Sequence, residues 1–214
     1  MAARVPHGLK YQVAGRLRVG RMPYSLVHPD SVVVQIGAPA DTLRSGRSRA
    51  MHFALRTREF GQTIVIEPDG LSVEAFRQVA ASLGVSGYET VQCGVWSKKD
   101  SLRFFINDAH PASNFTGGTV EYSESELSAY RTVEVPVRTL DDIVASLGLN
   151  RVDLVSITTN GAEEEILKGM SQTMAAGLRY ISLARTEEGY VELLRGYGYK
   201  FLAHDDRGFT FASE

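Results

Sequence analysis

The sequence has a single cysteine, Cys93, which excludes an intramolecular disulfide framework and favours a reducing compartment. It also lacks any apolar run close to the roughly 18 residues that a membrane span needs. Residues 1–30 contain no continuous apolar stretch of the kind that forms the core of a signal peptide. These absences predict a cytoplasmic protein without a membrane segment, stabilised by its hydrophobic core rather than by disulfides.

Several ligand-binding signatures are missing as well. The five histidines contain no pair at metal-ligand spacing, so we expect no metal site. The glycine turn after the first apolar run lacks both the Gly-Lys-Ser/Thr of a P-loop and the further glycines of a dinucleotide fingerprint. No zinc, RRM-like or helix-turn-helix pattern is present, which disfavours nucleic acid as a partner.

The net charge of −2 conceals an uneven distribution of charge along the chain. Residues 1–58 carry a balance of +8, whereas residues 59–214 carry a balance of −10. This asymmetry favours charge complementarity within the fold or between subunits of a homo-oligomer, and an anionic substrate or partner is the alternative. Five arginines in or before the first predicted helix are expected on a solvated face: Arg44, Arg47, Arg49, Arg56 and Arg58.

From residue 31 onward, short apolar runs alternate with amphipathic stretches. The apolar runs predict buried strands at 31–36, 63–67, 88–93, 152–157 and 180–183. The amphipathic stretches predict helices at 45–59, 72–83, 140–147, 162–170 and 187–195, with Ser72 capping the second. Further strands are expected at 102–106 and 132–137 around a polar loop at 107–130, and at 199–203 and 208–211 as a terminal hairpin.

This alternation predicts an α/β sandwich with a mostly parallel sheet. Residues 31–214 would form this domain, preceded by a basic N-terminal extension at 1–30. In such sheets, ligands bind beyond the carboxyl ends of the strands, at the point where the strand order reverses. The segments that follow the predicted strands are therefore the place to look for chemistry.

Two strand ends carry informative residues. Gly37 follows the first strand, where the absence of a Cβ would let a ligand approach the backbone closely, although a tight turn without a ligand explains it equally well. Glu67 closes the second strand, where a carboxylate can accept hydrogen bonds from both hydroxyls of a ribose. A solvated strand end beside the following Pro-Asp-Gly turn is the alternative for Glu67.

Five segments appear in an order and spacing that resemble the FkbM family of S-adenosylmethionine-dependent methyltransferases: 33–38, 65–69, 93–97, 135–142 and 152–169. The resemblance covers about residues 31–204. It implies a class I methyltransferase fold, which is Rossmann-like, with a seven-stranded sheet whose last strands form a hairpin. It also implies S-adenosylmethionine as the cofactor.

The resemblance assigns roles by position. Gly37 and its flanks, Gln35 and Ala38, would hold the methionine part of the cofactor. Glu67, followed by Pro68, would bind the ribose, and Gly94 with Val95 would lie near the adenine. The polar segment around 107–116 would lie beside the substrate opening, and His110 lies within it.

The sequence departs from the family at the first and fourth strands. Gln35 replaces an aspartate, and Asp41 takes the place of a second glycine. In the fourth strand the lysine and the two carboxylates before the glycine are Ser156, Thr158 and Asn160. The candidate catalytic residues are Asn160, Glu163 and His110, although Asn160 could equally be a local cap and Glu163 could serve the helix dipole.

The leading hypothesis is a methyltransferase that acts on oxygen of a sugar or a secondary-metabolite small molecule. The alternative is a catalytically degenerate protein of the same fold that acts as a binding or scaffold module, because neither threonine nor an amide can act as a base. A third, weaker hypothesis is modification of nucleic acid through the basic N-terminal part.

Overall fold

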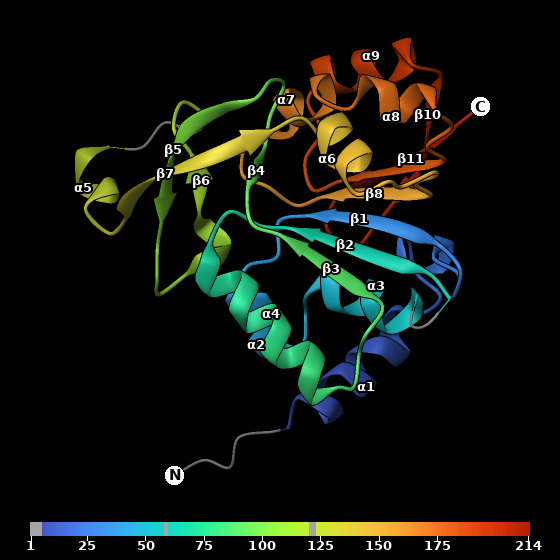
Figure 1. Cartoon of the computed structure of the whole chain (residues 1–214), viewed down its shortest axis with the longest axis horizontal. Helices are drawn as coiled ribbons and strands as arrows, with labels where there is room; N and C mark the ends of the chain where they lie inside the picture. Colours follow the sequence, from blue (N-terminus) through green and yellow to red (C-terminus); the bar gives the residue numbers. More distant parts are fainter. Residues whose placement is uncertain (1–5, 58–59, 120–122) are drawn as a thin grey trace.

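The computed structural model describes residues 6–57, 60–119 and 123–214 (Figure 1). Its main sheet has seven strands in the order β10-β11-β9-β8-β1-β2-β3. Strands β3, β2, β1, β8 and β9 are parallel, while β11 runs antiparallel to both β9 and β10. The strands are β1 (Val32–Ile36), β2 (Gln62–Ile66), β3 (Tyr88–Val91), β8 (Leu154–Ile157), β9 (Tyr180–Leu183), β10 (Tyr199–His204) and β11 (Phe209–Ser213). The predicted α/β fold, with its parallel sheet and terminal hairpin, is confirmed.

Helices cover both faces of this sheet (Figure 1). One face packs against α1 (His7–Arg18), α2 (Ala40–Ser45), α3 (Arg49–Thr57) and α4 (Gly70–Ser82). The other packs against α6 (Leu140–Ser146), α7 (Glu163–Lys168), α8 (Ser171–Ala175) and α9 (Glu188–Gly196). Because strand side chains alternate between faces, Val34 and Ile36 join the second core while Gln35 faces the first.

A second, smaller sheet lies beside the carboxyl ends of the parallel strands (Figure 1). It has the order β4-β7-β5-β6, formed by β4 (Gly94–Val95), β5 (Asp100–Ile106), β6 (Phe115–Thr116) and β7 (Arg131–Arg138). The strands predicted at 102–106 and 132–137 belong to this sheet. Between them, the expected polar loop contains a short 3-10 helix, η2 (Pro111–Ser113), and the helix α5 (Glu124–Leu127), while residues 120–122 lie outside the described chain.

Two predicted helix starts are corrected by local backbone geometry. The helix expected at 45–59 is divided into α2 and α3, because Gly46 adopts a left-handed conformation (φ +77°) that ends α2. Residues 58–59 lie outside the described chain. The helix expected from Ser72 begins at Gly70, because Asp69 is its N-cap and accepts hydrogen bonds from the backbone N–H groups of Leu71 and Ser72.

The described part of the N-terminal segment packs on the helical face that contains α3. The Tyr11 hydroxyl donates to the Leu43 carbonyl at 2.9 Å, and both tyrosines of this segment are buried. The second of them, Tyr24 in the 3-10 helix η1 (Tyr24–Leu26), donates its hydroxyl to Asp206 Oδ2 at 2.6 Å. These contacts join residues 6–30 to α2 and to the terminal hairpin. Residues 1–5 lie outside the described chain.

Arg49 corrects the expectation of a solvated arginine face. Its side chain is 1% exposed and its Nη2 lies 2.5 Å from carboxylate oxygens of both Asp205 and Asp206, in the turn between β10 and β11. Its Nη1 donates to Ser182 Oγ at 2.6 Å, and that hydroxyl donates in turn to Asp205. A cation from the basic part of the chain is thus neutralised by the acidic part within one fold.

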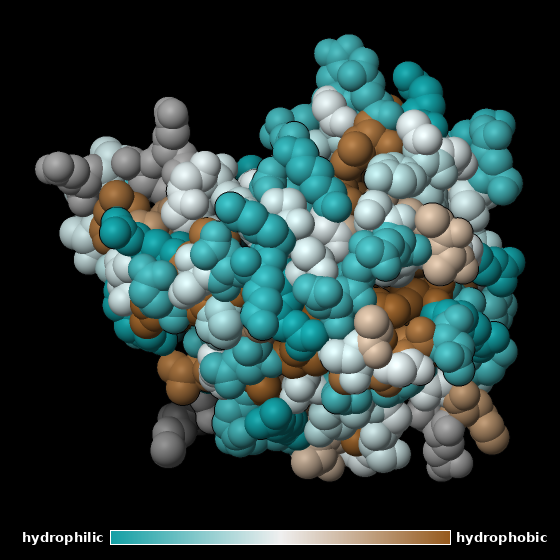
Figure 2. Space-filling model, turned by 45° about the horizontal axis from the view of Figure 1, so that its top comes forward, coloured by the Kyte–Doolittle hydropathy of each residue, from teal (hydrophilic) through white to brown (hydrophobic). Residues whose placement is uncertain are grey.

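No helix in the described ranges is both long enough and apolar enough to cross a bilayer. The face drawn in Figure 2 is mostly hydrophilic, and hydrophobic residues show through between the polar side chains as smaller separate areas.

We expect Arg49→Met to lower the free energy of unfolding by about 3–5 kcal/mol, because the substitution leaves the carboxylate of Asp205 buried without its cation. Arg44→Met is the matched control, since Arg44 is exposed and its loss should change stability by less than about 0.5 kcal/mol. Urea unfolding followed by circular dichroism measures both. Equal stabilities for the two variants would contradict a structural role for the Arg49 ion pair.

Candidate active site

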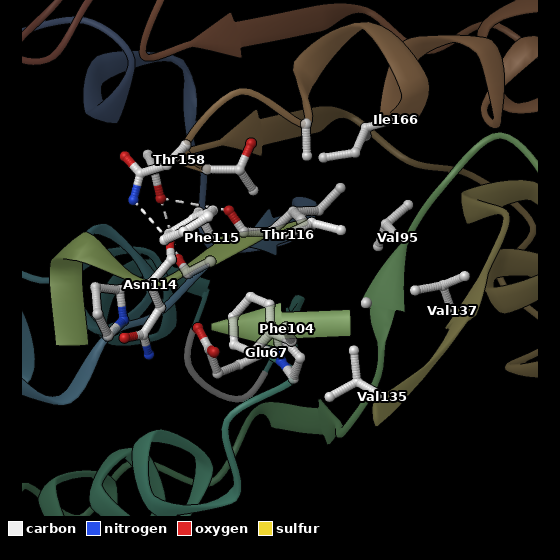
Figure 3. A pocket seen from close by; sticks show the side chains of 18 of the residues that line it. Glu67, Val95, Phe104, Asn114, Phe115, Thr116, Val135, Val137, Thr158 and Ile166 are labelled. Atoms are coloured by element: carbon white, nitrogen blue, oxygen red, sulfur yellow. Dashed lines mark hydrogen bonds between the residues drawn. The ribbon is translucent and has the colours of Figure 1, made fainter. Parts of the chain in front are cut away.

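The carboxyl ends of β1, β2 and β8 open onto a pocket that the small sheet closes from the other side. It contains about 670 Å³ of space free of atoms, part of it open to solvent. Figure 3 shows the labelled side chains of Glu67 and Thr158, from the main sheet, and of Phe104, Val135 and Val137, from the small sheet, around one space. The pocket lies where the strand order reverses, between β1 and β8, as expected for ligand sites in such sheets.

Gly37 brings two strand ends into direct contact. It has φ +88°, and a Cβ at this position would lie 2.7 Å from the Thr158 carbonyl oxygen. Its N–H donates to the Ile66 carbonyl at 2.9 Å, which ties the turn to β2 as well. A side chain here would therefore push β1 away from β8, so glycine is required by the close approach of the backbone as well as by its positive φ.

Glu67 is the buried carboxylate of the pocket. It is 4% exposed, and its Oε2 accepts a hydrogen bond from the Ala38 N–H at 2.7 Å while its Oε1 accepts one from the Asp69 N–H at 3.0 Å. Burial raises the pKa of this carboxyl to about 7, although the two backbone donors act in the opposite direction. A carboxylate oxygen can accept two hydrogen bonds, so each oxygen of Glu67 has the capacity to accept a further one from a hydroxyl donor.

Gln35, expected to contact the cofactor, lies beneath the Gly37 turn instead of lining the pocket. It is fully buried, and its Nε2 donates to the carbonyls of Ile36 (3.0 Å) and Gly37 (2.9 Å) and to Thr158 Oγ1 (2.8 Å). Within the described chain its Oε1 has no hydrogen-bond partner. In this structure the Gln35 amide holds the turn against β8.

Asn160 lies at the pocket wall, as do its neighbours Thr158 and Thr159. Its Nδ2 donates to the carbonyls of Ala112 (3.0 Å) and Asn114 (2.8 Å). The buried Oγ1 of Thr159 lies near the carboxyl of Glu163 and lowers the pKa of that group.

The other two catalytic candidates do not line the pocket. Glu163 is fully buried at the start of α7, and neither of its carboxylate oxygens has a hydrogen-bond partner in the described chain. Burial raises the pKa of this carboxyl, while the nearby Thr159 hydroxyl and the Arg185 charge lower it by less. His110 is exposed, on the outside of the segment that precedes η2.

The remaining cofactor candidates divide in the same way. The pocket lining includes Pro68, Gly94 and Val95 together with Gly37 and Glu67. Ala38 is not part of the lining, but its backbone N–H donates a hydrogen bond to the Glu67 carboxylate. Sequence reasoning missed the apolar wall formed by Phe104, Phe115, Val135 and Val137. These residues come from three strands, β5, β6 and β7, and nothing in the sequence showed that their apolar side chains turn toward the end of the main sheet.

The residues present fit one part of S-adenosylmethionine better than the other. Glu67 has acceptors free for a ribose diol, and Gly94, Val95 and Val137 form an apolar slot suited to an adenine ring. For the ammonium of the methionine part, the described lining offers no second carboxylate beside Glu67. The groups there are hydroxyls and backbone carbonyls of the segment 158–160.

The sheet order, with an antiparallel last strand inserted beside β9, and the pocket at the β1–β8 switch point define a class I methyltransferase fold. The chain belongs to the methyltransferase FkbM domain family, whose sequence model matches residues 35–201. S-adenosylmethionine is the cofactor that this class of fold and family use. No curated protein matches the sequence.

Three solved structures illustrate what this chain is similar to. Fibrillarin from Aeropyrum pernix in complex with natively bound S-adenosyl-L-methionine is 13% identical, with 94% of this chain and 73% of that chain covered and a TM-score of 0.48. An rRNA methylase from Streptococcus thermophilus is 12% identical (100% and 98% covered, TM-score 0.47). The O-methyltransferase TomG from Streptomyces achromogenes, involved in tomaymycin synthesis, is 11% identical (97% and 79% covered, TM-score 0.45).

The raised pKa of Glu67 predicts a specific dependence of stability on pH. The folded protein holds this proton up to about pH 7, whereas an unfolded chain releases it near 4.5. The group therefore stabilises the fold fully below pH 4.5, and this contribution, up to about 3 kcal/mol, is lost as pH rises through 7. Glu67→Gln should remove the decline, and Glu74→Gln, at an exposed position on α4, should retain it.

Urea unfolding at pH 5 and pH 8 measures this difference for the wild type and both variants. The readout is the change with pH and not the absolute stability, because glutamine can accept from only one of the two backbone donors. An unchanged decline in Glu67→Gln would show that the carboxyl of Glu67 titrates normally.

Proposed function

We propose that this chain binds S-adenosylmethionine in the pocket at the ends of β1, β2 and β8 and transfers its methyl group to a hydroxyl of a small molecule. The observation that carries the proposal is Glu67, a buried carboxylate with free acceptors at the end of β2, next to a glycine turn that exposes backbone. In a chain of a methyltransferase family, a carboxylate at this strand end would accept hydrogen bonds from the hydroxyls of the ribose.

The chain's own residues would divide the work of holding the cofactor. Glu67 would accept hydrogen bonds from the ribose, Val95 and Val137 would pack against the adenine, and Gly37 would present backbone to the methionine part. When bound, the cofactor supplies an electrophilic methyl group on a sulfonium.

The titratable side chains of the described pocket lining are poorly suited to act as a general base, which favours a substrate hydroxyl that can accept the methyl group without one. These side chains are Glu67 and Cys93. Burial raises the pKa of the Cys93 thiol to about 11, so it stays protonated, and Glu67 is occupied on the ribose side. Rate would then come from positioning and desolvating the two reactants. Such a site suits an acidic hydroxyl on a secondary-metabolite scaffold better than a sugar alcohol.

A binding module without catalysis is the second candidate, and the polar residues at the strand ends favour it. Gln35, Thr158 and Asn160 are neutral where the family typically has charged side chains, and their hydrogen bonds go to the protein itself. A protein of this kind would bind a ligand in the same pocket and turn nothing over. Binding and turnover therefore have to be measured separately.

Titration calorimetry of the full chain with S-adenosylmethionine and with its demethylated product tests the proposal. We expect both to bind with dissociation constants below about 100 μM, a free energy of roughly −5.5 kcal/mol. Absence of binding of either at millimolar concentration would overturn the cofactor assignment. Tight binding without transfer to any of a panel of phenols, catechols and sugars would favour the binding module.

Affinity for the demethylated product should rise with pH, because the ionised Glu67 accepts hydrogen bonds from hydroxyls more strongly than the protonated form. We expect about tenfold tighter binding at pH 8 than at pH 6, since the pKa of Glu67 lies near 7. Binding at pH 7 should release a proton, visible as a dependence of the enthalpy on the buffer. Glu67→Gln should lose both effects and Glu74→Gln should keep them; a pH dependence that survives in Glu67→Gln would contradict this role.

A further inference from the structure

Residues 107–119 lie across the carboxyl end of β8 and are attached there by several contacts. The Asn160 amide donates to two carbonyls of this segment, those of Ala112 and Asn114, at 3.0 and 2.8 Å. In return, Thr119 Oγ1 donates to the Asn160 carbonyl at 3.1 Å. Gly161 has φ +85°, and a Cβ there would lie 2.5 Å from the Thr119 carbonyl oxygen, so the two chains are in direct backbone contact.

The attached segment has an internal structure of its own. Asn114 Oδ1 accepts from the Asn107 N–H at 2.8 Å, and Asn107 Oδ1 accepts from the Ala109 and His110 N–H groups. Phe115 pairs with Phe105 in a stacked arrangement, with ring centroids 4.7 Å apart. The segment is therefore a preformed unit, held to the small sheet on one side and to Asn160 on the other.

This unit forms one wall of the pocket. Pro111, Ala112, Asn114, Phe115 and Thr116 all line it, and Figure 3 shows Asn114, Phe115 and Thr116 on the side nearest to Thr158. The hydrogen bonds from the Asn160 amide therefore hold this wall of the pocket at the end of the main sheet.

The chemistry of the contact requires an amide. Both partners of the Asn160 side chain are carbonyl oxygens, which only accept hydrogen bonds, and an amide nitrogen supplies two donors. A carboxylate of the same shape would have no donor and would face two negative dipoles. The Nδ2 donor of Asn160 is therefore committed to the segment.

We propose that Asn160 is a positioning residue that closes the pocket by holding residues 107–119 in place, and that it does not act on substrate. Its effect on a ligand rests on the proposed function, whereas its effect on the segment does not. Without the two amide hydrogen bonds, the segment would remain attached through β6 and through the Thr119 hydrogen bond to the Asn160 carbonyl, and its part around Ala112 and Asn114 would lose its hold on the end of β8.

Hydrogen exchange of the full-length protein without ligand tests the contact directly. In Asn160→Ala the backbone amides of Asn107 and Asn114 should exchange roughly tenfold faster, because two hydrogen bonds are lost. In Asn160→Asp the same amides should exchange faster still, because repulsion from the two carbonyls is added. The exchange rates of the backbone amides in β1 and β2 should be unchanged in both variants, which would show that the fold is intact.

Asn114→Asp is the matched control for the added charge. The substitution places the same negative charge on the other residue of the Asn160–Asn114 contact. It keeps the Oδ1 acceptor for the Asn107 N–H and leaves the Asn114 carbonyl available to the Asn160 amide. Segment exchange should therefore change by less than about threefold in this variant. If Asn160→Asp fails to fold, Asn160→Ala alone decides. Unchanged exchange at 107–119 in the folded variants would overturn the proposal.

Calorimetry with the demethylated cofactor separates this inference from the proposed function. If the wild type binds, Asn160→Ala should bind at least fivefold more weakly, because the wall is released without any new charge in the pocket, and undiminished binding would overturn the closing role. If the wild type does not bind, the proposed function fails, while the exchange measurements still decide whether Asn160 holds the segment.

Discussion

The whole site depends on the direct contact between the ends of β1 and β8. Gly37 permits this contact because any Cβ would meet the Thr158 carbonyl, and Gln35 secures it from below by donating to the Gly37 carbonyl and to Thr158 Oγ1. With the two ends joined, the Ala38 N–H lies within reach of Glu67. The position of the Glu67 carboxylate, at the end of β2, thus follows from the backbone contact between the neighbouring strand β1 and β8.

The departures from the family form a connected set. Gln35 and Asn160 are both amides that donate to two carbonyls each, and Thr158 bridges the β1 turn with a hydroxyl. A carboxylate placed singly at 35 or 160 would lose these donors and face carbonyl oxygens instead. The neutral residues are therefore compatible with one another, and returning one of them to an acid would disturb the turn or the pocket wall before it could supply a charge.

Local pattern was enough to predict the features that depend on strand ends. Gly37 and Glu67 were identifiable because each follows a short β-branched run, and parallel strands bring such residues to one edge. The small sheet and the contacts of Asn160 were not identifiable, because they depend on pairing between segments such as β5 and β7 that are distant in sequence. Arg49 was misjudged for the same reason: its partners, Asp205 and Asp206, lie 156 and 157 residues away.

Two parts of the structure give the uneven distribution of charge along the chain a physical explanation: one helix-covered face of the sheet and the ends of its strands. On the face covered by α1–α4, the cation of Arg49 is matched by the terminal hairpin, so part of the basic excess of the N-terminal region is used inside the fold. At the strand ends, amides and hydroxyls replace ionised groups, and Glu67 is the acid that remains in the described lining. Because the pKa of Glu67 lies near 7, this one carboxyl sets the charge of the described pocket lining around neutrality.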